Sequence, residues 1–160
     1  MKITGEDSIS NEIKKVLQVT FVIGIGLMII IPILALYYII KEPNGVTFPF
    51  LLYPIGIYIT GFPALIILYK FIKLFNLLKE NNPFVEDTVK YLKIVSNSSL
   101  FISIVYFILI IIAIWIKNIY FVMFSIIVLG VFFVAWISAY ILSELFKTAN
   151  DYKKENDLTI

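Results

Sequence analysis

Polar and apolar residues fall in long blocks along this chain rather than alternating at single positions. Four stretches carry no charged side chain, and they run over Val16–Ile40, Pro43–Tyr69, Ile94–Ile116 and Asn118–Ser143. Each is longer than the roughly 20 apolar residues that cross a hydrocarbon core about 30 Å thick. Inside lipid a helix satisfies its own backbone N–H and C=O groups, so each stretch is predicted to be helical. The pattern predicts an all-α, polytopic membrane protein with four transmembrane helices.

The four predicted spans form a single membrane domain over residues 1–160, arranged as two hairpins. We expect the spans at about residues 16–40, 51–70, 94–116 and 118–143, with polar segments at residues 1–15, 70–93 and 144–160. Prolines set the start of the second span near residue 51, because proline removes a helical hydrogen bond. Residues 43–50 are therefore expected to be irregular.

The central polar segment predicts a short amphipathic helix between the second and third spans. Asn82 and Pro83 suit an N-cap and a first helical position, and Glu86 and Asp87 suit the first turn of a helix dipole. The apolar stripe of this helix is Phe84, Val85, Val89 and Leu92. The surplus of lysine over acid in the segment also suits binding to anionic lipid headgroups.

Lysine predicts the orientation, because cytoplasmic loops of membrane proteins retain positive charge. Eleven of the thirteen lysines lie in the three polar segments, and only Lys41 and Lys117 lie on the other side. With four spans, both termini are predicted to be cytoplasmic. The absence of arginine and the abundance of isoleucine are typical of an AT-rich bacterial genome, so we expect the bacterial inner or plasma membrane.

Composition narrows the chemistry that this protein can carry out. The chain is 61% hydrophobic and 15% charged, with no cysteine and no histidine. Thiol chemistry and Cys/His zinc sites are excluded, and the predicted spans hold no ionisable residue of the kind that marks a proton relay or ion path. We expect no enzymatic activity, no catalytic residue, no cofactor and no metal, and no direct binding to nucleic acid.

Small residues predict where the last two spans pack. Ser96, Ser99 and Ser103 share one face of the third span, and Ala135 and Ala139 lie four residues apart on the fourth. Small residues at helical spacing let helix backbones approach closely in lipid. We expect the two spans to pack there; the same face could instead serve self-association, and a homodimer is a possible assembly.

Gly61 and Pro63 predict a kink in the middle of the second span. Such a kink offers two interpretations. It can form a small cavity or hinge for a ligand, or it can be an ordinary bend, because glycine and proline are common in transmembrane helices.

Two short motifs resemble a known family. They are Pro83-Phe84-Val85-Glu86 followed by Lys90-x-Leu92, and the closing residues Glu155-Asn156-Asp157-Leu158-Thr159-Ile160. Together with the four spans they resemble the YoaS-like bacterial membrane proteins grouped as domain of unknown function 2975. That family often shows Asn after the acid of the first motif and arginines beyond it, where this chain has Asp87 and Lys90.

The resemblance implies a partner rather than a reaction. Such proteins are often encoded beside a small Xre-like helix-turn-helix regulator, and no enzymatic activity is attached to the family. The first hypothesis is therefore a membrane-bound partner that sequesters a helix-turn-helix regulator through its cytoplasmic tail. The tail residues that would bind are Asp157, Leu158, Thr159 and Ile160, and those that would brace them are Pro83, Phe84, Glu86 and Leu92.

Two alternatives stay open at this point. The protein can be a small transport, channel or immunity-type membrane protein that acts through its helices, with the Gly61–Pro63 kink and the Ser96–Ser103 face as its working parts. It can also be purely structural. The acidic tail can simply dock on the basic central segment instead of binding a partner.

Overall fold

A computed structural model of the chain describes residues 9–41, 48–79 and 85–157. These residues form four helices and no strand: α1 (Ile9–Lys41), α2 (Phe48–Lys79), α3 (Glu86–Trp115) and α4 (Ile119–Asp157). Each helix is long and apolar enough to cross a membrane. The predicted all-α fold with four such helices is confirmed.

Large apolar side chains are exposed along all four helices. Ile40, Trp115 and Tyr120 are each more than three-quarters exposed. The most apolar part of α1 has no buried residue at all. A soluble monomer rarely exposes an apolar surface of this extent, because water makes it costly. The four apolar helices are therefore consistent with a multi-pass membrane protein.

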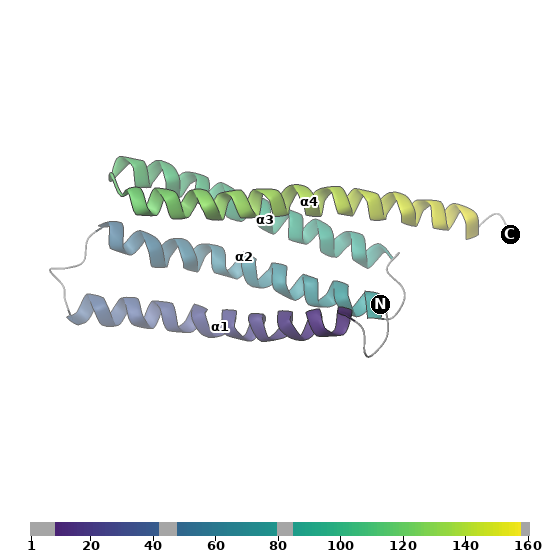
Figure 1. Cartoon of the computed structure of the whole chain (residues 1–160), viewed down its shortest axis with the longest axis horizontal. Helices are drawn as coiled ribbons and strands as arrows, with labels where there is room; N and C mark the ends of the chain where they lie inside the picture. The colour runs from purple at the N-terminus through teal and green to yellow at the C-terminus, as the bar shows by residue number, and fades with distance from the viewer. Residues whose placement is uncertain (1–8, 42–47, 80–84, 158–160) are drawn as a thin grey trace.

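α1, α2 and the crossed pair of α3 and α4 lie side by side in a row, in that order (Figure 1). α1 packs on α2, α2 on α3, and α3 on α4, and the α3–α4 contact is the most extensive of the three. The start of α1 and the end of α4 lie at the same end of the molecule, as an even number of crossings requires. The predicted hairpins, α1–α2 and α3–α4, are thus joined through the contact between α2 and α3.

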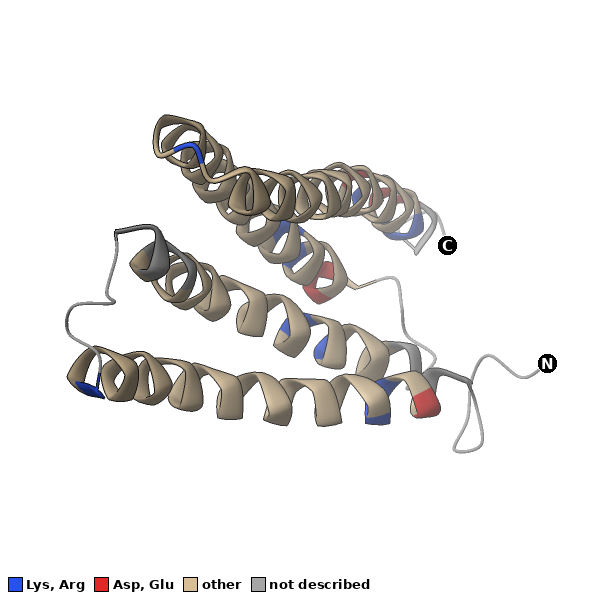
Figure 2. Cartoon of the chain, turned by 60° about the vertical axis from the view of Figure 1, so that its left-hand side comes forward, with Lys and Arg blue, Asp and Glu red and all other residues tan. Residues whose placement is uncertain are grey.

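Lysines mark one end of the molecule (Figure 2). Lysine positions at the start of α1, towards the end of α2, at the start of α3 and at the end of α4 all lie towards this end, and we call it the lysine-rich end. Lys41 and Lys117 are the described lysines at the opposite end. The direction in which this end faces across a membrane stays a prediction.

α3 packs on two neighbours, α2 and α4. Eight of its buried residues recur at intervals of four and three positions, namely Thr88, Leu92, Val95, Ser99, Ile102, Tyr106, Leu109 and Ala113, and Ser96 and Ser103 are buried beside them. This spacing is the heptad pattern of helices that pack at small crossing angles with interlocking side chains. The pattern runs through almost the whole of α3, so α2 and α4 both find a packing partner along its length.

Glycine permits close contact at two crossings of α2. At Gly56, an added Cβ would lie 2.9 Å from Cδ1 of Leu109 on α3. At Gly61, it would collide with the sulfur of Met28 on α1. These two glycines let α2 approach both of its neighbours more closely than a larger residue would allow.

Over the described residues, the short amphipathic helix expected ahead of the third span is the first part of α3 rather than an element of its own. α3 begins at Glu86 and continues unbroken through Leu92 into its apolar stretch. Val85 precedes it in an extended conformation, with φ −131° and ψ 157°. No glycine or proline interrupts residues 86–115, so nothing ends the helix at the boundary of the apolar stretch.

Two helix starts also differ from expectation. α2 begins at Phe48, so residues 48–50 are helical rather than irregular. Pro49 falls in the first turn, where a backbone N–H has no intrahelical partner and proline is tolerated. α1 begins at Ile9. It contains Pro32 in its interior, and no structural role was predicted for this proline.

The turn between α3 and α4 is very short. Lys117 adopts a left-handed conformation with φ 57°. The Asn118 N–H donates to the carbonyl of Ala113 at 3.0 Å, and the Asn118 side-chain oxygen accepts from the Phe121 N–H at 3.2 Å. The turn thereby closes one helix and caps the next, which fixes the α3–α4 hairpin.

Candidate functional site

α4 continues well beyond its charge-free stretch, which ends at Ser143. Residues 144–157 of α4 form a polar helical extension, which we call the arm. At 1.5 Å per residue the arm is about 20 Å long. Figure 1 shows it extending past the start of α3 at the lysine-rich end.

One ion pair joins the arm to α3. Lys154 Nζ lies 2.5 Å from Glu86 Oε1, between residues 68 positions apart in the chain. The Lys154 ammonium lowers the pKa of Glu86, through its hydrogen bond first and its charge second. The same two effects of Glu86 raise the pKa of Lys154. Both side chains are more than half exposed, so water and salt weaken the attraction.

This ion pair differs from the docking considered from the sequence. The sequence favoured an acidic tail on a basic central segment, whereas the contact joins a lysine of the tail to an acid of that segment. Net charge of a segment does not identify which side chains meet. The position of Glu86 at the first turn of α3 brings it beside the arm, and the sequence contains no signal that pairs it with Lys154.

Buried polar side chains lie along the contact between the arm and α3. Asn150 on the arm, Ser143 just before it, and Thr88 on α3 are all buried. Ser143 donates its hydroxyl to the carbonyl of Tyr140 at 2.8 Å. The arm is thus packed against α3 over several turns and is held by more than its one ion pair.

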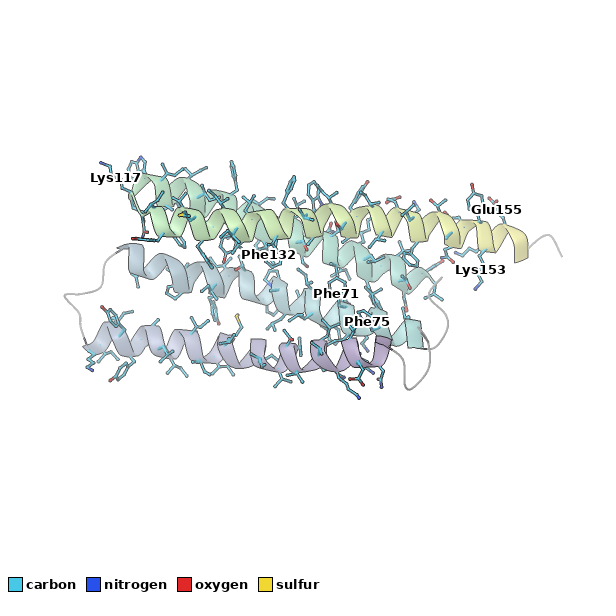
Figure 3. All side chains as sticks on the ribbon, viewed as in Figure 1. Phe71, Phe75, Lys117, Phe132, Lys153 and Glu155 are labelled. Carbon is cyan, nitrogen blue, oxygen red and sulfur yellow. The ribbon has the colours of Figure 1, made fainter. Side chains whose placement is uncertain are left out.

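A neighbouring face of the arm is acidic. Glu144, Asp151 and Glu155 lie seven and then four residues apart, so they share one face of the helix, and all three are exposed. We call these three residues the acidic stripe. Tyr152 and Leu145, each more than 60% exposed, lie beside it. Figure 3 shows Glu155 directed away from the rest of the molecule and Lys153 on the other side of the arm.

The predicted partner-binding residues are only partly within the described structure. α4 ends at Asp157, and Leu158–Ile160 lie outside the described residues, as do Pro83 and Phe84. Glu86 is exposed and paired with Lys154. Leu92 is buried in the α3 seam, so it supports packing and offers no surface to a partner.

The structure places the predicted packing residues in the interior. Ser96, Ser99, Ser103 and Ala139 are buried, and Ser96 donates its hydroxyl to the carbonyl of Trp136 on α4 at 3.4 Å. Ser99, Ala135 and Ala139 line one cavity of about 160 Å³, together with residues of α2. The Ser99 hydroxyl has no hydrogen-bond partner among the described residues.

A second cavity lies beside Gly61. It has a volume of about 180 Å³ and is lined from three helices by Thr60, Gly61 and Ala64, by Ile102 and Tyr106, and by Val128 and Phe132. α2 runs through Gly61 and Pro63 as one continuous helix. Phe132, labelled in Figure 3, borders both this cavity and the one at Ser99.

The cavities are lined mainly by apolar side chains. Thr60 donates its hydroxyl to the carbonyl of Gly56 at 2.7 Å, so the hydroxyl is already occupied. Over the part of the chain that the structure describes, no three His, Cys, Asp or Glu side chains lie together as metal ligands. The arrangement can hold a small apolar molecule.

Comparison with known proteins identifies a family. The sequence model of one protein family matches residues 4–160 of the chain, and the description of that family is protein of unknown function (DUF2975). No curated protein and no solved structure matches the chain. The narrower YoaS-like grouping continues to rest on the resemblance alone.

Proposed function

The chain belongs to the DUF2975 family of proteins of unknown function, and from that premise we propose that it is a membrane-bound regulatory protein. In this proposal it holds a small helix-turn-helix transcription regulator at the bilayer through the arm. The observation that carries the proposal is the braced arm itself. A transmembrane anchor has no structural need of a further 14-residue helix with one acidic face.

The brace supports this role because it gives the arm a fixed surface. Lys154 pairs with Glu86, and Asn150 is buried beside the start of α3. A helix held in place loses less conformational entropy when a partner binds than a flexible tail does. The arm therefore meets a partner as a preformed surface.

The acidic stripe supports a partner of basic character. Proteins that bind DNA carry a positive surface that matches the phosphate backbone. Glu144, Asp151 and Glu155 present negative charge along one exposed face, and Tyr152 adds an exposed aromatic ring of the kind that is common in protein interfaces. The stripe would compete with DNA for the basic surface of the regulator, so binding at the membrane would keep the regulator from its operator.

Membrane fractionation tests the proposal directly. A small helix-turn-helix regulator of the kind that the family resemblance implies is co-expressed with the protein, and the distribution of the regulator between membrane and soluble fractions is measured. With the natural sequence we expect the regulator in the membrane fraction. With Glu144→Gln, Asp151→Asn and Glu155→Gln combined, we expect most of it in the soluble fraction. Deletion of residues 150–160 should have the same effect.

A matched control removes lysines from the same arm. Lys147→Gln combined with Lys153→Gln makes the arm more acidic, so it should retain the regulator at least as well as the natural sequence. Equal membrane retention with the acidic stripe neutralised would contradict the proposal. A regulator that stays soluble beside the unchanged protein would contradict it as well.

The two cavities favour a second candidate, a small transport, channel or immunity-type protein that acts through its helices. Both lie where α2 meets α3 and α4, and Phe132 borders each. In this case Pro63→Ala or Ser99→Leu should change the sensitivity of cells to a toxic peptide or solute, while deletion of residues 150–160 should not. Unchanged sensitivity in both variants would remove the basis for this candidate.

A further inference from the structure

Two lysines and two tyrosines meet where α2 and α3 leave their apolar stretches. Tyr69 is the last residue of the charge-free stretch of α2, and Lys70 and Lys73 follow it. Tyr91 lies in the corresponding position before the apolar stretch of α3. Residues at such boundaries lie at the level of lipid headgroups, where tyrosine and lysine are enriched.

The two lysines lie over the ring of Tyr69, and one of them also lies over the ring of Tyr91. Lys70 Nζ lies 5.5 Å from the centre of the Tyr69 ring and 4.8 Å from that of Tyr91, and Lys73 Nζ lies 5.6 Å from the Tyr69 ring. The Phe21 ring of α1 lies 6.3 Å from the Tyr69 ring, so three helices contribute to the arrangement. Both ammonium groups are therefore held within 6 Å of the same aromatic ring.

Among the residues that the structure describes, this arrangement concentrates positive charge without an acidic partner. The nearby described acids have other partners: Glu12 pairs with Lys15, Asp87 with Lys90, and Glu86 with Lys154. Neither Lys70 nor Lys73 has an acidic partner among the described residues. Like charges repel each other, and the electron-rich faces of the rings offset only part of that cost. An anion between the two ammonium groups would remove the repulsion and gain a charge-assisted hydrogen bond from each.

An exposed apolar track continues from this site along α2. Ile55, Phe62 and Tyr69 lie seven residues apart, so they share one helix face, and Lys73 extends the same face by four residues. All three of these apolar or aromatic side chains are at least 44% exposed. The face thus has a cationic head followed by an apolar body. This is the shape of a phospholipid, and a free phosphate would use only the head.

We propose that Lys70 and Lys73, held in place by the rings of Tyr69 and Tyr91, bind the phosphate of an anionic phospholipid, with its acyl chains along Phe62 and Ile55. The lipid would connect α2 to α3 through Lys70 and Tyr91, and α2 to α1 through the Phe21–Tyr69 contact. It would act as a structural link across the row at the lysine-rich end. This site is separate from the arm and does not depend on a protein partner.

Lipid binding to the full-length protein tests the proposal. The protein is purified in a neutral detergent and titrated with phosphatidylglycerol or phosphatidylcholine, and bound lipid is measured by native mass spectrometry. We expect saturable binding of phosphatidylglycerol and much weaker binding of phosphatidylcholine. Lys70→Gln combined with Lys73→Gln should lower the affinity for phosphatidylglycerol by at least about tenfold.

The control pair is Lys147→Gln with Lys153→Gln, which removes the same charge from the same end of the molecule away from the rings. It should leave phosphatidylglycerol binding within about twofold of the natural protein. Equal loss in both pairs would show that net charge alone attracts the lipid, and it would overturn the proposed site. Helix content and apparent melting temperature of each variant in detergent verify that the fold is retained.

The rings and the acyl chains are tested separately. Tyr91→Leu should weaken phosphatidylglycerol binding, and Tyr91→Phe, which keeps the ring face, should retain it. Glycerol 3-phosphate, which supplies the headgroup chemistry without acyl chains, should fail to displace the lipid at equal concentration. Displacement by glycerol 3-phosphate would assign the site to a soluble phosphate and overturn the lipid proposal.

Discussion

Small polar side chains occupy the interior of this protein, where a soluble protein would place larger apolar ones. Ser99 and Ser125 are fully buried, and their hydroxyls have no hydrogen-bond partner among the described residues. Meanwhile isoleucine and phenylalanine cover the exterior. In lipid the hydrophobic effect does not distinguish the two locations, so close approach of the helices decides which residue is inside. Small polar side chains are therefore buried next to large apolar ones such as Ile102 and Phe121.

The close contact at Gly61 gives a prediction at the scale of one residue. Gly61→Val would push against Met28 on α1, so it should lower the stability of the fold by about 1–3 kcal/mol. Gly26→Val is the matched control, because no atom lies within 4 Å of a Cβ added at Gly26. Thermal unfolding in detergent measures both. Equal stability of the two variants would contradict the assigned contact.

Lys117 gives a second prediction, which concerns backbone strain. Its φ of 57° raises the conformational energy of a residue that has a Cβ, whereas glycine adopts this φ without that cost. Lys117→Gly should therefore be more stable than Lys117→Ala by about 1 kcal/mol. Both variants remove the same charge, so their difference in unfolding temperature isolates the backbone term. An alanine variant as stable as the glycine variant would argue against the left-handed turn.

At the scale of elements, the helices are longer than a bilayer requires. α4 has 39 residues, and α3 has 30, whereas about 20 cross a hydrocarbon core. The surplus of both helices lies at the lysine-rich end, where the arm packs on the first turns of α3. No residue between Glu86 and Leu92 ends α3, and no residue between Ser143 and Asp157 ends α4. In each helix the apolar part and the polar part therefore form one continuous, rigid element.

The Glu86–Lys154 ion pair gives a prediction for the arm. Lys154→Glu places two acids together, so it should detach the end of the arm from α3. Lys154→Glu combined with Glu86→Lys exchanges the two charges and should restore the attachment of the arm. The natural chain has no cysteine. Spin labels at Lys93→Cys and Tyr152→Cys can therefore report the distance between α3 and the arm. A distance that does not change in Lys154→Glu would show that the pair does not hold the arm.

The same labels should show a pH dependence. The pKa of Glu86 is lowered from 4.5, so its contribution is present above that value and is lost as the pH falls through the lowered pKa. The pKa of Lys154 is raised from 10.5, so its contribution is present below that value and is lost as the pH rises through the raised pKa. Attachment should be strongest between these limits and weaker in high salt.

The sequence predicted the all-α fold, the four helices long enough to span a membrane and the face of α3 that packs. These features could be predicted because charge-free blocks and the spacing of small residues can be read from neighbouring positions in the sequence. It did not predict the continuous α3 from Glu86, since the end of an apolar stretch does not end a helix. It also missed the Glu86–Lys154 pair and the Lys70–Tyr91 contact. Both join different helices, and their partners depend on the relative register of the helices, which no local pattern encodes.

At the scale of the whole molecule, the described lysines separate the two ends. The predicted orientation places the lysine-rich end in the cytoplasm, because translocation of many lysines is unfavourable. Single cysteines at Lys117→Cys and Thr148→Cys test it with a membrane-impermeant maleimide. In intact cells we expect labelling at 117 and protection at 148, and in permeabilised cells labelling at both. Labelling at 148 in intact cells would reverse the orientation.

The linear order of the helices leaves the molecule with two free flanks. α1 has its extensive contacts with α2 alone, and α1 and α4 share no extensive contact among the described residues. A ring of helices must open before another span can join it, whereas a row can lengthen at its margin. An additional transmembrane segment could therefore be accommodated against α1 while the serine-lined seam between α3 and α4 stays undisturbed.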